Sequence, residues 1–377
     1  MFMLYRTMKR CGRRLSILGF GCMRLPTKED GTIDDRSAKR LIRHAIDSGV
    51  NYIDTAYPYH HGQSEPFVGQ VLKDGYREKV NLATKLPTWL IKERKDMDKY
   101  LDEQLSRLQT DHVDFYLIHG LGKTSWDQME SLDIKGFLDG AIQDGRINYA
   151  GFSFHDDLNT FKRIVDSYDW TFCQIQYNYL DEAFQAGTLG LRYAAARGLG
   201  VIAMEPLRGG LLSKRIPGLD RIWSGQDRFR TPSELALRWV WNHPEVVTVL
   251  SGMNAPSQLE ENLRTAEVAV PYALTEEDLV LVKRLKAFYR RRMRINCTGC
   301  SYCMPCPNDV DIPECFTLYN NAFAFDSEEG SRRAYNTFLA KSGGAALCKA
   351  CSRCVTLCPQ KLEIPAKLKE VEVFFIK

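Results

Sequence analysis

The sequence predicts an α/β protein in two parts, a (β/α)8 TIM barrel followed by a small, mainly α-helical domain. Three observations support this fold class. Strand-like and helix-like segments alternate eight times within roughly 250 residues, which is the size and count of a closed barrel. The chain of 377 residues suits one barrel with an appendage. Eight of its 12 cysteines lie in two dense runs near the C-terminus, which sets that end apart.

The alternation follows a hairpin of two short strands expected within residues 3–18, about a Cys11-Gly12 turn. Each later apolar run ends in polar residues and leads into a helical segment. The expected strand and helix pairs are 17–25 with 34–48, 52–56 with 64–73, 80–86 with 92–108, 113–119 with 134–144, 149–154 with 157–168, 172–177 with 183–197, 201–207 with 232–242, and 246–251 with 257–266. An open doubly wound sheet would show the same alternation, but the count of eight favours the barrel.

A long amphipathic helix is expected at residues 275–292, and it ends in a group of arginines that leads directly into the cysteine region. We place the domain boundary there. Residues 1–289 are expected to form the barrel with its N-terminal hairpin, and residues 290–377 the C-terminal domain. The arginines suit a solvated helix end, and beside an anionic metal centre they would also balance charge.

Composition excludes several classes of function. A net charge of +4, without a long basic run interleaved with aromatics, argues against a nucleic-acid partner. The sequence contains no run of 18 apolar residues, so no membrane span is predicted. Arg6 and Lys9 interrupt the apolar N-terminus, so no signal-peptide core is predicted either. We therefore expect a cytoplasmic protein, where a reducing environment makes dense cysteine runs metal ligands and not disulfides.

Chemistry-bearing side chains stand at the ends of three consecutive expected strands. Asp54, Lys85 and His119 each close a strand, and Tyr59 follows in the loop after Asp54. The C-terminal ends of barrel strands form the catalytic face, and neighbouring strands lie about 4.8 Å apart. We expect the four side chains to converge on one mouth, with Lys85 between Asp54 and Tyr59.

This combination suits proton transfer to a carbonyl oxygen. A phenol has a reference pKa near 10, and the Lys85 ammonium is expected to lower the pKa of Tyr59 toward working pH. Tyr59 would then donate a proton to a developing alkoxide, while His119 hydrogen-bonds the same oxygen. A single strand-end lysine or histidine is usually structural, but four compatible residue types favour catalysis.

The chain resembles the aldo/keto reductase superfamily over most of residues 15–270. The resemblance is carried by Asn51-Tyr52-Ile53-Asp54-Thr55-Ala56 with Tyr59, by Thr84-Lys85, Ile118-His119, Gly151-Phe152-Ser153 and Gln174, and by Ser251 through Asn262. It implies that Asp54, Tyr59, Lys85 and His119 form the catalytic tetrad. It also implies hydride transfer between a nicotinamide and a carbonyl carbon, with Tyr59 as the acid.

The resemblance further implies a set of cofactor contacts. Ser153 and Gln174 would hold the carboxamide, and Met204 stands where an aromatic residue commonly stacks on the nicotinamide. The remaining contacts, along the pyrophosphate and around the adenosine, are expected from Gly21, Met23, Leu207, Arg208, Gly209, Gly210, Ser251, Gly252, Gln258, Glu261 and Asn262.

The cofactor is expected to be NADP or NAD. In the family, lysine and arginine commonly bind the 2′-phosphate of NADPH. At those positions this chain has Gly252 or Met253, and Gln258. Losing each such charge-assisted contact would remove roughly 1.5–3 kcal/mol. Arg208 is a candidate replacement.

The two cysteine runs predict iron-sulfur clusters. The second run, Cys348, Cys351, Cys354 and Cys358 followed by proline, matches the bacterial ferredoxin spacing in full, and the first run, Cys297, Cys300, Cys303 and Cys306, differs by one residue before its last cysteine. Because the fourth cysteine of each run ligates the other cluster in two-cluster ferredoxins, we expect one [4Fe-4S] cluster on Cys297, Cys300, Cys303 and Cys358. The other would use Cys306, Cys348, Cys351 and Cys354. Structural zinc is the alternative.

The segment between the runs, residues 312–346, is expected to be largely helical, as in an α-helical dicluster ferredoxin module. Cys315 within it is expected to be a buried small hydrophobe and not a ligand.

The predicted function is an oxidoreductase that reduces an aldehyde or ketone with NAD(P)H, or oxidises an alcohol, and whose two clusters exchange electrons with a redox partner protein or with the substrate. Two alternatives remain open. One is an electron-transfer protein whose barrel binds a nucleotide or flavin without hydride transfer. The other is a binding or regulatory barrel with structural clusters.

Overall fold

The computed structural model describes residues 2–224, 228–229 and 231–376. Contacts divide the chain into two compact units. The first comprises Met1–Glu182, Ala186–Leu207 and Ser233–Leu274, and the second comprises Ala183–Gln185, Arg208–Pro232 and Thr275–Lys377. In the described part of the chain, no helix combines the length and apolar character that a membrane crossing requires.

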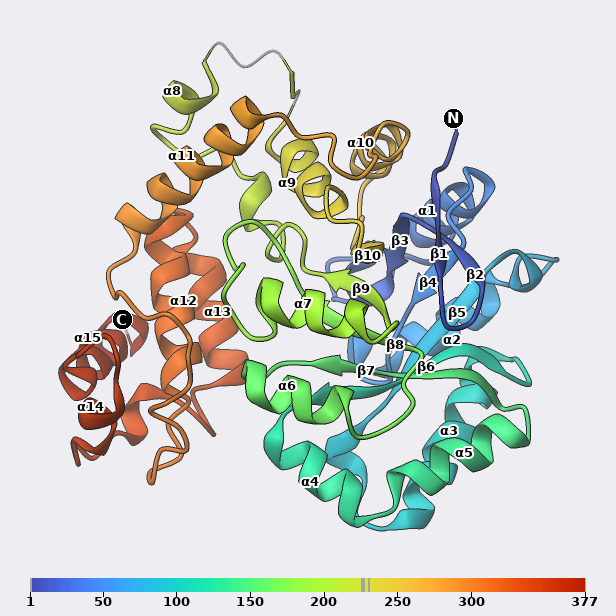
Figure 1. Ribbon diagram of the computed structural model, residues 1–377, viewed down its shortest axis with the longest axis horizontal. Helices are drawn as coiled ribbons and strands as arrows, with labels where there is room; N and C mark the ends of the chain where they lie inside the picture. The colour runs from blue at the N-terminus through green and yellow to red at the C-terminus, as the bar shows by residue number, and fades with distance from the viewer. Residues whose placement is uncertain (1, 225–227, 230, 377) are drawn as a thin grey trace. The chain divides into compact units, whose positions relative to one another are not determined.

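The first unit is a closed barrel of parallel strands, as Figure 1 shows. Among the described residues, the barrel order is β10-β3-β4-β5-β6-β7-β8-β9, so each strand pairs with its neighbour in sequence and β10 closes on β3. The strands are β3 (Leu18–Gly21), β4 (Tyr52–Asp54), β5 (Asn81–Leu86), β6 (Val113–Leu121), β7 (Ile147–Phe154), β8 (Phe172–Gln176), β9 (Gly200–Met204) and β10 (Val246–Ser251). The predicted barrel is confirmed, and the open sheet is excluded.

The helices of the first unit follow the strands in the expected alternation. They are α1 (Asp35–Asp47), α2 (Ser64–Val71), α3 (Arg94–Leu108), α4 (Lys123–Ser131), α5 (Ile134–Gln143), α6 (Leu158–Val165), α7 (Gly187–Ala196), α9 (Pro232–Trp241) and α10 (Pro256–Ala266). Side chains cap several of them, since Asp34 accepts from Ser37 N and Asp157 from Thr160 N. α4 was not predicted, because the apolar periodicity of residues 123–131 is weak beside that of α5.

A hairpin closes one end of the barrel. Its strands β1 (Tyr5–Met8) and β2 (Arg13–Ser16) pair antiparallel, as predicted. Met8 and Leu15 are buried in one cluster with Tyr52, Phe115 and Phe172 of the barrel interior. The hairpin therefore supplies apolar side chains to the N-terminal end of the barrel core, opposite the strand ends that carry the expected catalytic residues.

The second unit is mainly helical, as predicted. Its helices are α8 (Asp220–Trp223), α11 (Glu276–Arg292), α12 (Ile312–Ala324), α13 (Glu328–Phe338), α14 (Arg353–Leu357) and α15 (Ile364–Ile376). The expected helix at residues 275–292 is α11, with Thr275 as its N-cap in a capping box with Asp278. The helices α12 and α13 occupy most of the expected helical segment 312–346, whereas α15 was not predicted.

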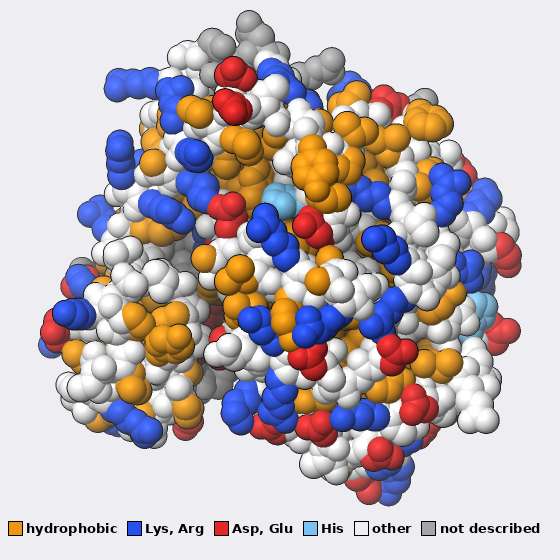
Figure 2. All heavy atoms as spheres, viewed as in Figure 1, with side chains coloured by type: hydrophobic (Ala, Val, Ile, Leu, Met, Phe, Trp, Pro, Cys, Tyr) orange, Lys and Arg blue, Asp and Glu red, His pale blue; other side chains and the backbone are white. Residues whose placement is uncertain are grey.

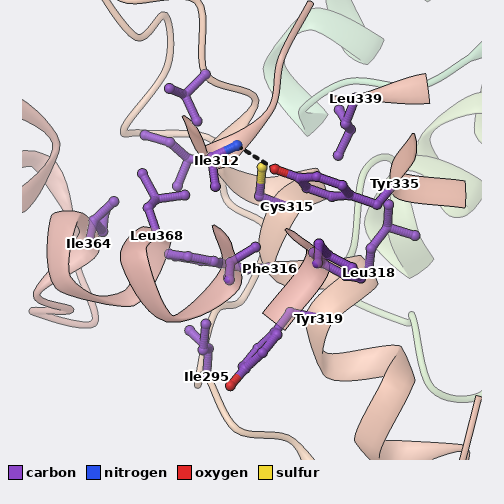
Figure 3. Packing of buried hydrophobic residues seen from close by; sticks show 14 residues of the cluster. Ile295, Ile312, Cys315, Phe316, Leu318, Tyr319, Tyr335, Leu339, Ile364 and Leu368 are labelled. Atoms are coloured by element: carbon purple, nitrogen blue, oxygen red, sulfur yellow. Dashed lines mark hydrogen bonds between the residues drawn. The ribbon is translucent and has the colours of Figure 1, made fainter. Parts of the chain in front are cut away.

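The core of the second unit lies between α12, α13 and α15. Figure 3 shows Phe316 and Leu368 facing each other in this core, and Tyr335 stacks on Phe375 with ring centroids 4.2 Å apart. Cys315 is fully buried here, as predicted, and burial raises the pKa of its thiol to about 12. It donates a weak hydrogen bond to the Gly343 oxygen at 3.5 Å.

Basic and acidic side chains are interspersed on the face shown in Figure 2, together with scattered hydrophobic side chains. This mixture agrees with the small net charge of the sequence.

Candidate functional site

The strand ends of the barrel bring the four expected catalytic residues together. Asp54 ends β4, Lys85 lies near the end of β5, and His119 lies in the last part of β6. The parallel register pairs Asp54 with Ala83 and Lys85 with Leu117, so the three side chains leave neighbouring strands at similar heights. This convergence is the one that the sequence predicted.

Lys85 is the centre of the group. Its ammonium donates to Asp54 Oδ1 at 2.6 Å, to the Thr55 backbone oxygen at 2.8 Å and to the Tyr59 hydroxyl at 3.3 Å. Three donors are the full complement of an ammonium group. Only 1% of Lys85 and 2% of Asp54 is exposed, so the pair is held away from water.

The pKa values of Lys85 and Asp54 depend on their burial and on the charge of the partner residue. Burial disfavours the charged ammonium, but Asp54 and Tyr59 outweigh it, and the pKa of Lys85 lies above its ordinary value. Burial raises the pKa of Asp54, and Lys85 counters part of this rise. At neutral pH Lys85 is therefore held in its cationic form beside Tyr59.

The pKa of Tyr59 differs from the expectation. Lys85 lowers it, as predicted, but burial of the phenol has the larger effect, so the pKa lies above its ordinary value of 10.0. The prediction that this pKa falls toward working pH is wrong, because the sequence analysis counted the charge of Lys85 and left out desolvation of the phenol. The raised pKa keeps Tyr59 protonated, as an acid requires.

His119 completes the mouth. Its ring centroid lies 6.2 Å from that of Tyr59 in an edge-on arrangement, and burial with the nearby Lys85 charge lowers its pKa well below 6.5. The neutral imidazole keeps one donor and one acceptor nitrogen. Its Nδ1 has no hydrogen-bond partner among the described residues. The backbone oxygen of His119 accepts from Thr88 Oγ1 at 2.9 Å, which ties β6 to the loop after β5.

The loop carrying Tyr59 has an unusual backbone. Tyr59 N bonds to the Ala56 oxygen at 3.1 Å, and the next two residues, His60 and His61, have left-handed φ angles of 51° and 53°. Such angles are uncommon for residues other than glycine. His60 Nε2 accepts from Leu25 N at 3.1 Å, so the turn is attached to the loop after β3.

Several buried polar side chains form hydrogen bonds with one another and with the backbone of Lys85. The sequence analysis did not predict them. Glu65 on α2 is fully buried and accepts from Thr84 Oγ1 at 2.6 Å and from Gln104 Nε2 at 2.7 Å. Gln104, on α3, also donates to the Lys85 backbone oxygen at 2.9 Å and accepts from the Tyr116 hydroxyl at 2.8 Å. We call Glu65, Thr84, Gln104 and Tyr116 the Glu65 network. A glutamate and a glutamine inside otherwise apolar helix faces were the only sequence signal.

Trp89 borders the same mouth. It is 54% exposed, and its ring centroid lies 5.3 Å from that of His119. An exposed tryptophan beside the expected position of the substrate carbonyl oxygen suits one side of a substrate-binding pocket. By contrast, Trp126 is fully buried and packs edge-on against Trp170, so it belongs to the core.

The residues expected at the carboxamide lie on adjacent strands. Ser153 on β7 pairs with Gln174 on β8, and both are nearly fully buried. Gln174 Nε2 reaches Met204 Sδ at 3.5 Å, whereas its Oε1 has no partner among the described residues. A buried amide oxygen without a partner suits the amino group of a carboxamide. Ser153 Oγ accepts from Gly120 N at 2.8 Å, and its hydroxyl proton remains available to donate.

Gly151 explains why β7 and β8 approach so closely here. A Cβ at this position would lie 2.4 Å from the Phe172 ring, so a side chain other than hydrogen cannot fit. The glycine of the Gly151-Phe152-Ser153 motif therefore has a packing reason, which is to leave room for the Phe172 ring.

The residues expected around the adenosine lie at the end of β10 and on α10. Asn262 Nδ2 donates to Ser251 Oγ at 2.9 Å, and both side chains are buried. Glu261 is partly buried, and Gln258 is exposed, with its Oε1 accepting from Asn254 N at 2.9 Å. Ser251 and Asn262 are thus already joined, while Gln258 caps its own loop.

A cation that the sequence did not single out lies beside this position. Arg24 follows Gly21 and Met23 in a short 3-10 helix, Cys22–Arg24, and a Cβ at Gly252 would lie 3.2 Å from Arg24 Cβ. Gly21 faces the Ser251 oxygen, since its Cβ would lie 3.6 Å away, whereas Met23 is 54% exposed. Closure of β10 on β3 creates this proximity of residues more than 200 positions apart.

The expected pyrophosphate segment is divided between the units. Leu207 ends a segment of the first unit, and Arg208, Gly209 and Gly210 belong to the second. These three residues have positive φ angles of 48°, 65° and 91°. The Arg208 guanidinium lies 5.6 Å from the ring centroid of Phe325, at the end of α12. The expected contact of this segment with a pyrophosphate remains a prediction.

An open groove of about 1250 Å³ lies at the other end of the barrel. Its lining includes Arg14 of the hairpin, Asn51, Asn81 and His112. These residues precede or begin the strands, whereas the tetrad stands at the strand ends. Barrel enzymes place their catalysis at the strand ends, so this groove is not a candidate active site.

The eight cysteines of the two runs gather in two sets. Cys297, Cys300, Cys303 and Cys358 line one small cavity, together with Ile312, Phe316 and other apolar side chains. Burial raises the pKa of Cys354, and the thiols that raise it further are Cys348, Cys351 and Cys306. The cavity lining and the thiols that act on Cys354 have the composition expected from the exchange of the fourth cysteine between runs, and Cys354 also raises the pKa of Cys303 in the other set.

Two polar side chains anchor the starts of the runs. Asn320 Oδ1 accepts from Arg294 N and Ile295 N, each at 2.9 Å, and its Nδ2 donates to the Ile295 oxygen at 2.8 Å. The Tyr335 hydroxyl accepts from Ala345 N at 2.7 Å, a bond drawn in Figure 3. Four-thiol sets held on a helical core fit iron-sulfur ligation.

Comparison with known proteins decides the family. The model of the aldo/keto reductase family matches residues 17–284, and that of a 4Fe-4S dicluster domain matches residues 296–363. The chain belongs to the aldo/keto reductase family. This aldo/keto reductase is thus an oxidoreductase with a 4Fe-4S dicluster domain at its C-terminal end.

Individual relatives agree with the family. L-galactose dehydrogenase from Arabidopsis thaliana is 28% identical over 74% of this chain and 93% of its own. The oxidoreductase YrpG from Bacillus subtilis is 26% identical over 71% of this chain and 92% of its own. The solved holo structure of the aldo-keto reductase AKR11C1 from Bacillus halodurans is 29% identical, with a TM-score of 0.63, over 75% of this chain and 96% of that one. About a quarter of this aldo/keto reductase lies outside each match.

Proposed function

We propose that this protein catalyses the NAD(P)H-dependent reduction of an aldehyde or ketone, or the reverse oxidation of an alcohol, and that two [4Fe-4S] clusters in its second unit exchange electrons. The observation that carries the catalytic part is the Lys85 ammonium, which bonds Asp54 and the Tyr59 hydroxyl at once. Family membership supports the same reaction class. Asp54, Tyr59, Lys85 and His119 are the proposed catalytic residues.

In this proposal Tyr59 holds the proton that reaches the carbonyl oxygen. Its raised pKa keeps it protonated until the substrate oxygen gains negative charge. Lys85 then stabilises the phenolate that remains, because a cation 3.3 Å away favours the ionised form. Asp54 holds Lys85 in place, and neutral His119 donates a hydrogen bond to the same substrate oxygen. A bound nicotinamide supplies the hydride.

Ser153 and Gln174 are the proposed holders of the carboxamide. The Gln174 Oε1 atom, buried and without a partner among the described residues, supports this assignment. Met204 would pack on the nicotinamide ring, since its sulfur lies 3.5 Å from the Gln174 amide. The remaining proposed cofactor contacts are those of Gly21, Met23, Leu207, Arg208, Gly209, Gly210, Ser251, Gly252, Gln258, Glu261 and Asn262.

NADPH is the cofactor that the charges favour. The Cβ, Cγ and Cδ atoms of Arg24 lie beside Gly252, so this cationic side chain passes a region where Gly252 and Gln258 themselves offer no charge. An arginine fork matches a phosphate group, whereas the hydroxyl of NADH gives it less to bind.

For the second unit, we propose that Cys297, Cys300, Cys303 and Cys358 hold one cluster and Cys306, Cys348, Cys351 and Cys354 the other. The composition of the two cysteine sets supports this partition. We also propose a functional division at residues 289 and 290, with the reductase before it and the iron-sulfur domain after it. The partners of the protein would be a small carbonyl compound and a redox protein.

Steady-state assays of iron-replete protein with NADPH and NADH, over a panel of aldehydes and ketones, test the catalytic proposal. Tyr59→Phe should lower kcat by about 10² to 10⁴-fold, because the proton donor is lost. The matched control is Tyr57→Phe in the same loop, since the Tyr57 hydroxyl donates to Glu103 Oε1 at 3.2 Å and not to a residue of the tetrad. Turnover that survives Tyr59→Phe, or no turnover with either cofactor in the unaltered protein, would overturn the proposal.

A further inference from the structure

The two cysteine sets differ in their surroundings. Cys297, Cys303 and Cys358 pack against the apolar core of the second unit, and their set lines a cavity with Ile312 and Phe316. In the other set, Cys306, Cys348 and Cys354 pack against the same core. The difference lies in the fourth cysteine of each set, since Cys351 is exposed whereas Cys300 is partly buried. All residues from Lys349 to Arg353 are exposed. A cluster held by this second set therefore has one edge at the protein surface.

The charges of the two runs also differ. The first run, residues 297–306, contains no charged residue. The stretch 348–361 contains Lys349, Arg353 and Lys361 and no acidic residue. All three cations are exposed, and none forms an ion pair with any residue that the structure describes. Leu357 at the end of α14, labelled in Figure 1, adds an apolar side chain that is 45% exposed.

Compensation of the clusters' own charge does not explain this difference. Two [4Fe-4S] clusters with four thiolates each carry the same net charge, so compensation would place cations in both runs. Between the cysteines, cations occur only in the second run, as Lys349 and Arg353. Of the arginines that precede the first run, Arg292 pairs with Asp326 and the Arg294 guanidinium lies 4.8 Å from the Phe323 ring centroid, so both make contacts within the unit. Their side chains stand in solvent, where they are available to a second molecule.

We propose that the surface formed by Lys349, Cys351, Arg353, Leu357 and Lys361 is the docking site of an acidic one-electron carrier protein. The proposal rests on the iron-sulfur clusters of the proposed function. In the docked complex, one electron passes from the reduced centre of the carrier to the cluster on Cys306, Cys348, Cys351 and Cys354. The carrier is oxidised by one electron and the cluster is reduced by one, and no bond or proton moves.

The physical features of the surface fit such a partner. Complementary charges raise association rates by about 10 to 10³-fold at low salt. Electron-transfer complexes use small interfaces, below about 1,200 Å², so a few cations around one exposed apolar side chain are sufficient. An acidic carrier would place its centre next to Cys351, the thiol of this set nearest to solvent.

Stopped-flow mixing of the anaerobic holoprotein with a small, acidic, dithionite-reduced bacterial ferredoxin tests the proposal. The docking variant is Lys349→Gln/Arg353→Gln, and the control is Lys283→Gln/Arg284→Gln, which removes the same charge from two exposed residues of α11. At an ionic strength of about 0.01 M, the docking variant should react at least tenfold more slowly, and its rate should depend less on salt. The control should react as the unaltered protein does.

A binding measurement gives a readout that needs no electron transfer. The anisotropy of a fluorescently labelled oxidised ferredoxin should report weaker binding for the docking variant only. Equal rates and affinities in all three proteins, or equal losses in both variants, would overturn the proposal. Should the double variant fail to assemble its clusters, Lys361→Glu, outside the cysteine run, must still slow the reaction at least threefold. Turnover with NADPH is measured separately, so its absence would count against the reductase proposal and not against the docking site.

Discussion

Gln104 donates a hydrogen bond of 2.7 Å to the buried carboxylate of Glu65, and the same amide group holds the backbone oxygen of Lys85 at 2.9 Å. The relationship joins two helices, α2 and α3, to the strand that carries the proposed catalytic ammonium. Burial raises the pKa of Glu65, and the hydrogen bonds from Thr84 and Gln104 counter that rise. A buried polar group of this kind is stabilising only while all its members are paired.

Replacement of Gln104 should therefore lower both stability and activity. Gln104→Leu leaves the Tyr116 hydroxyl without its acceptor and removes one hydrogen bond from Glu65, which keeps those from Thr84 and Arg107. The expected cost is about 2 to 4 kcal/mol in the free energy of unfolding. We also expect a lower kcat, because the Lys85 backbone loses its support. Urea unfolding and steady-state kinetics measure the two effects. Gln143→Leu, at an exposed position ending α5, should change neither, and a stable, fully active Gln104→Leu protein would contradict the prediction.

The raised pKa of Tyr59 predicts how the two directions of the reaction depend on pH. Reduction needs protonated Tyr59, which is present below its pKa and lost as pH rises through it. Since that pKa lies above 10.0, kcat/KM for reduction should stay flat between about pH 7 and 9. Alcohol oxidation needs the phenolate and should rise about tenfold per pH unit over the same range.

Lys85→Met provides a test of the same assignment. Removing the ammonium takes away the effect that lowers the pKa of Tyr59, so oxidation at any fixed pH should fall further than reduction. It also leaves Asp54 buried without its partner, so stability is measured alongside and Asp54→Asn/Lys85→Met is compared. An oxidation profile that Lys85→Met leaves unchanged would contradict the role of Lys85.

Arg24 predicts cofactor preference. Arg24→Ala should raise KM for NADPH by about 10 to 100-fold, which corresponds to one charge-assisted contact of roughly 1.5–3 kcal/mol. KM for NADH should change little. Lys28→Ala, an exposed cation of the same loop, serves as the control. An equal effect of Arg24→Ala on both cofactors would show that Arg24 does not read the 2′-phosphate.

The partition of the cysteines is testable by iron content and electron paramagnetic resonance. Cys297→Ser and Cys358→Ser should remove the same cluster, lowering iron from about eight atoms per chain to about four. Cys306→Ser and Cys348→Ser should remove the other cluster. Cys315→Ser, at a fully buried position in the helical core, should retain both. If Cys358→Ser and Cys348→Ser removed the same signal, each run would ligate its own cluster.

The sequence by itself predicted the barrel and all four proposed catalytic residues, three of them at strand ends and Tyr59 in the loop after Asp54. Alternating periodicities are local properties, and parallel strands end at the same edge of a barrel, so Asp54, Lys85 and His119 were predictable as neighbours. The spacing of the cysteine runs likewise indicated both the kind of centre and the exchange of the fourth ligand.

The tertiary structure decided those features that depend on contacts between residues far apart in the sequence. Arg24 lies beside Gly252 only because β10 closes on β3, and Glu65 meets Gln104 only because α2 packs on α3. The pKa of Tyr59 is another case, since its direction depends on how much water the fold excludes, and charge alone predicted the opposite sign. The exposure of Cys351, when the other seven cysteines of the runs are partly buried, also arises from the packing of the second unit. Local pattern encodes which side chains are present, whereas desolvation and long-range proximity are properties of the folded chain.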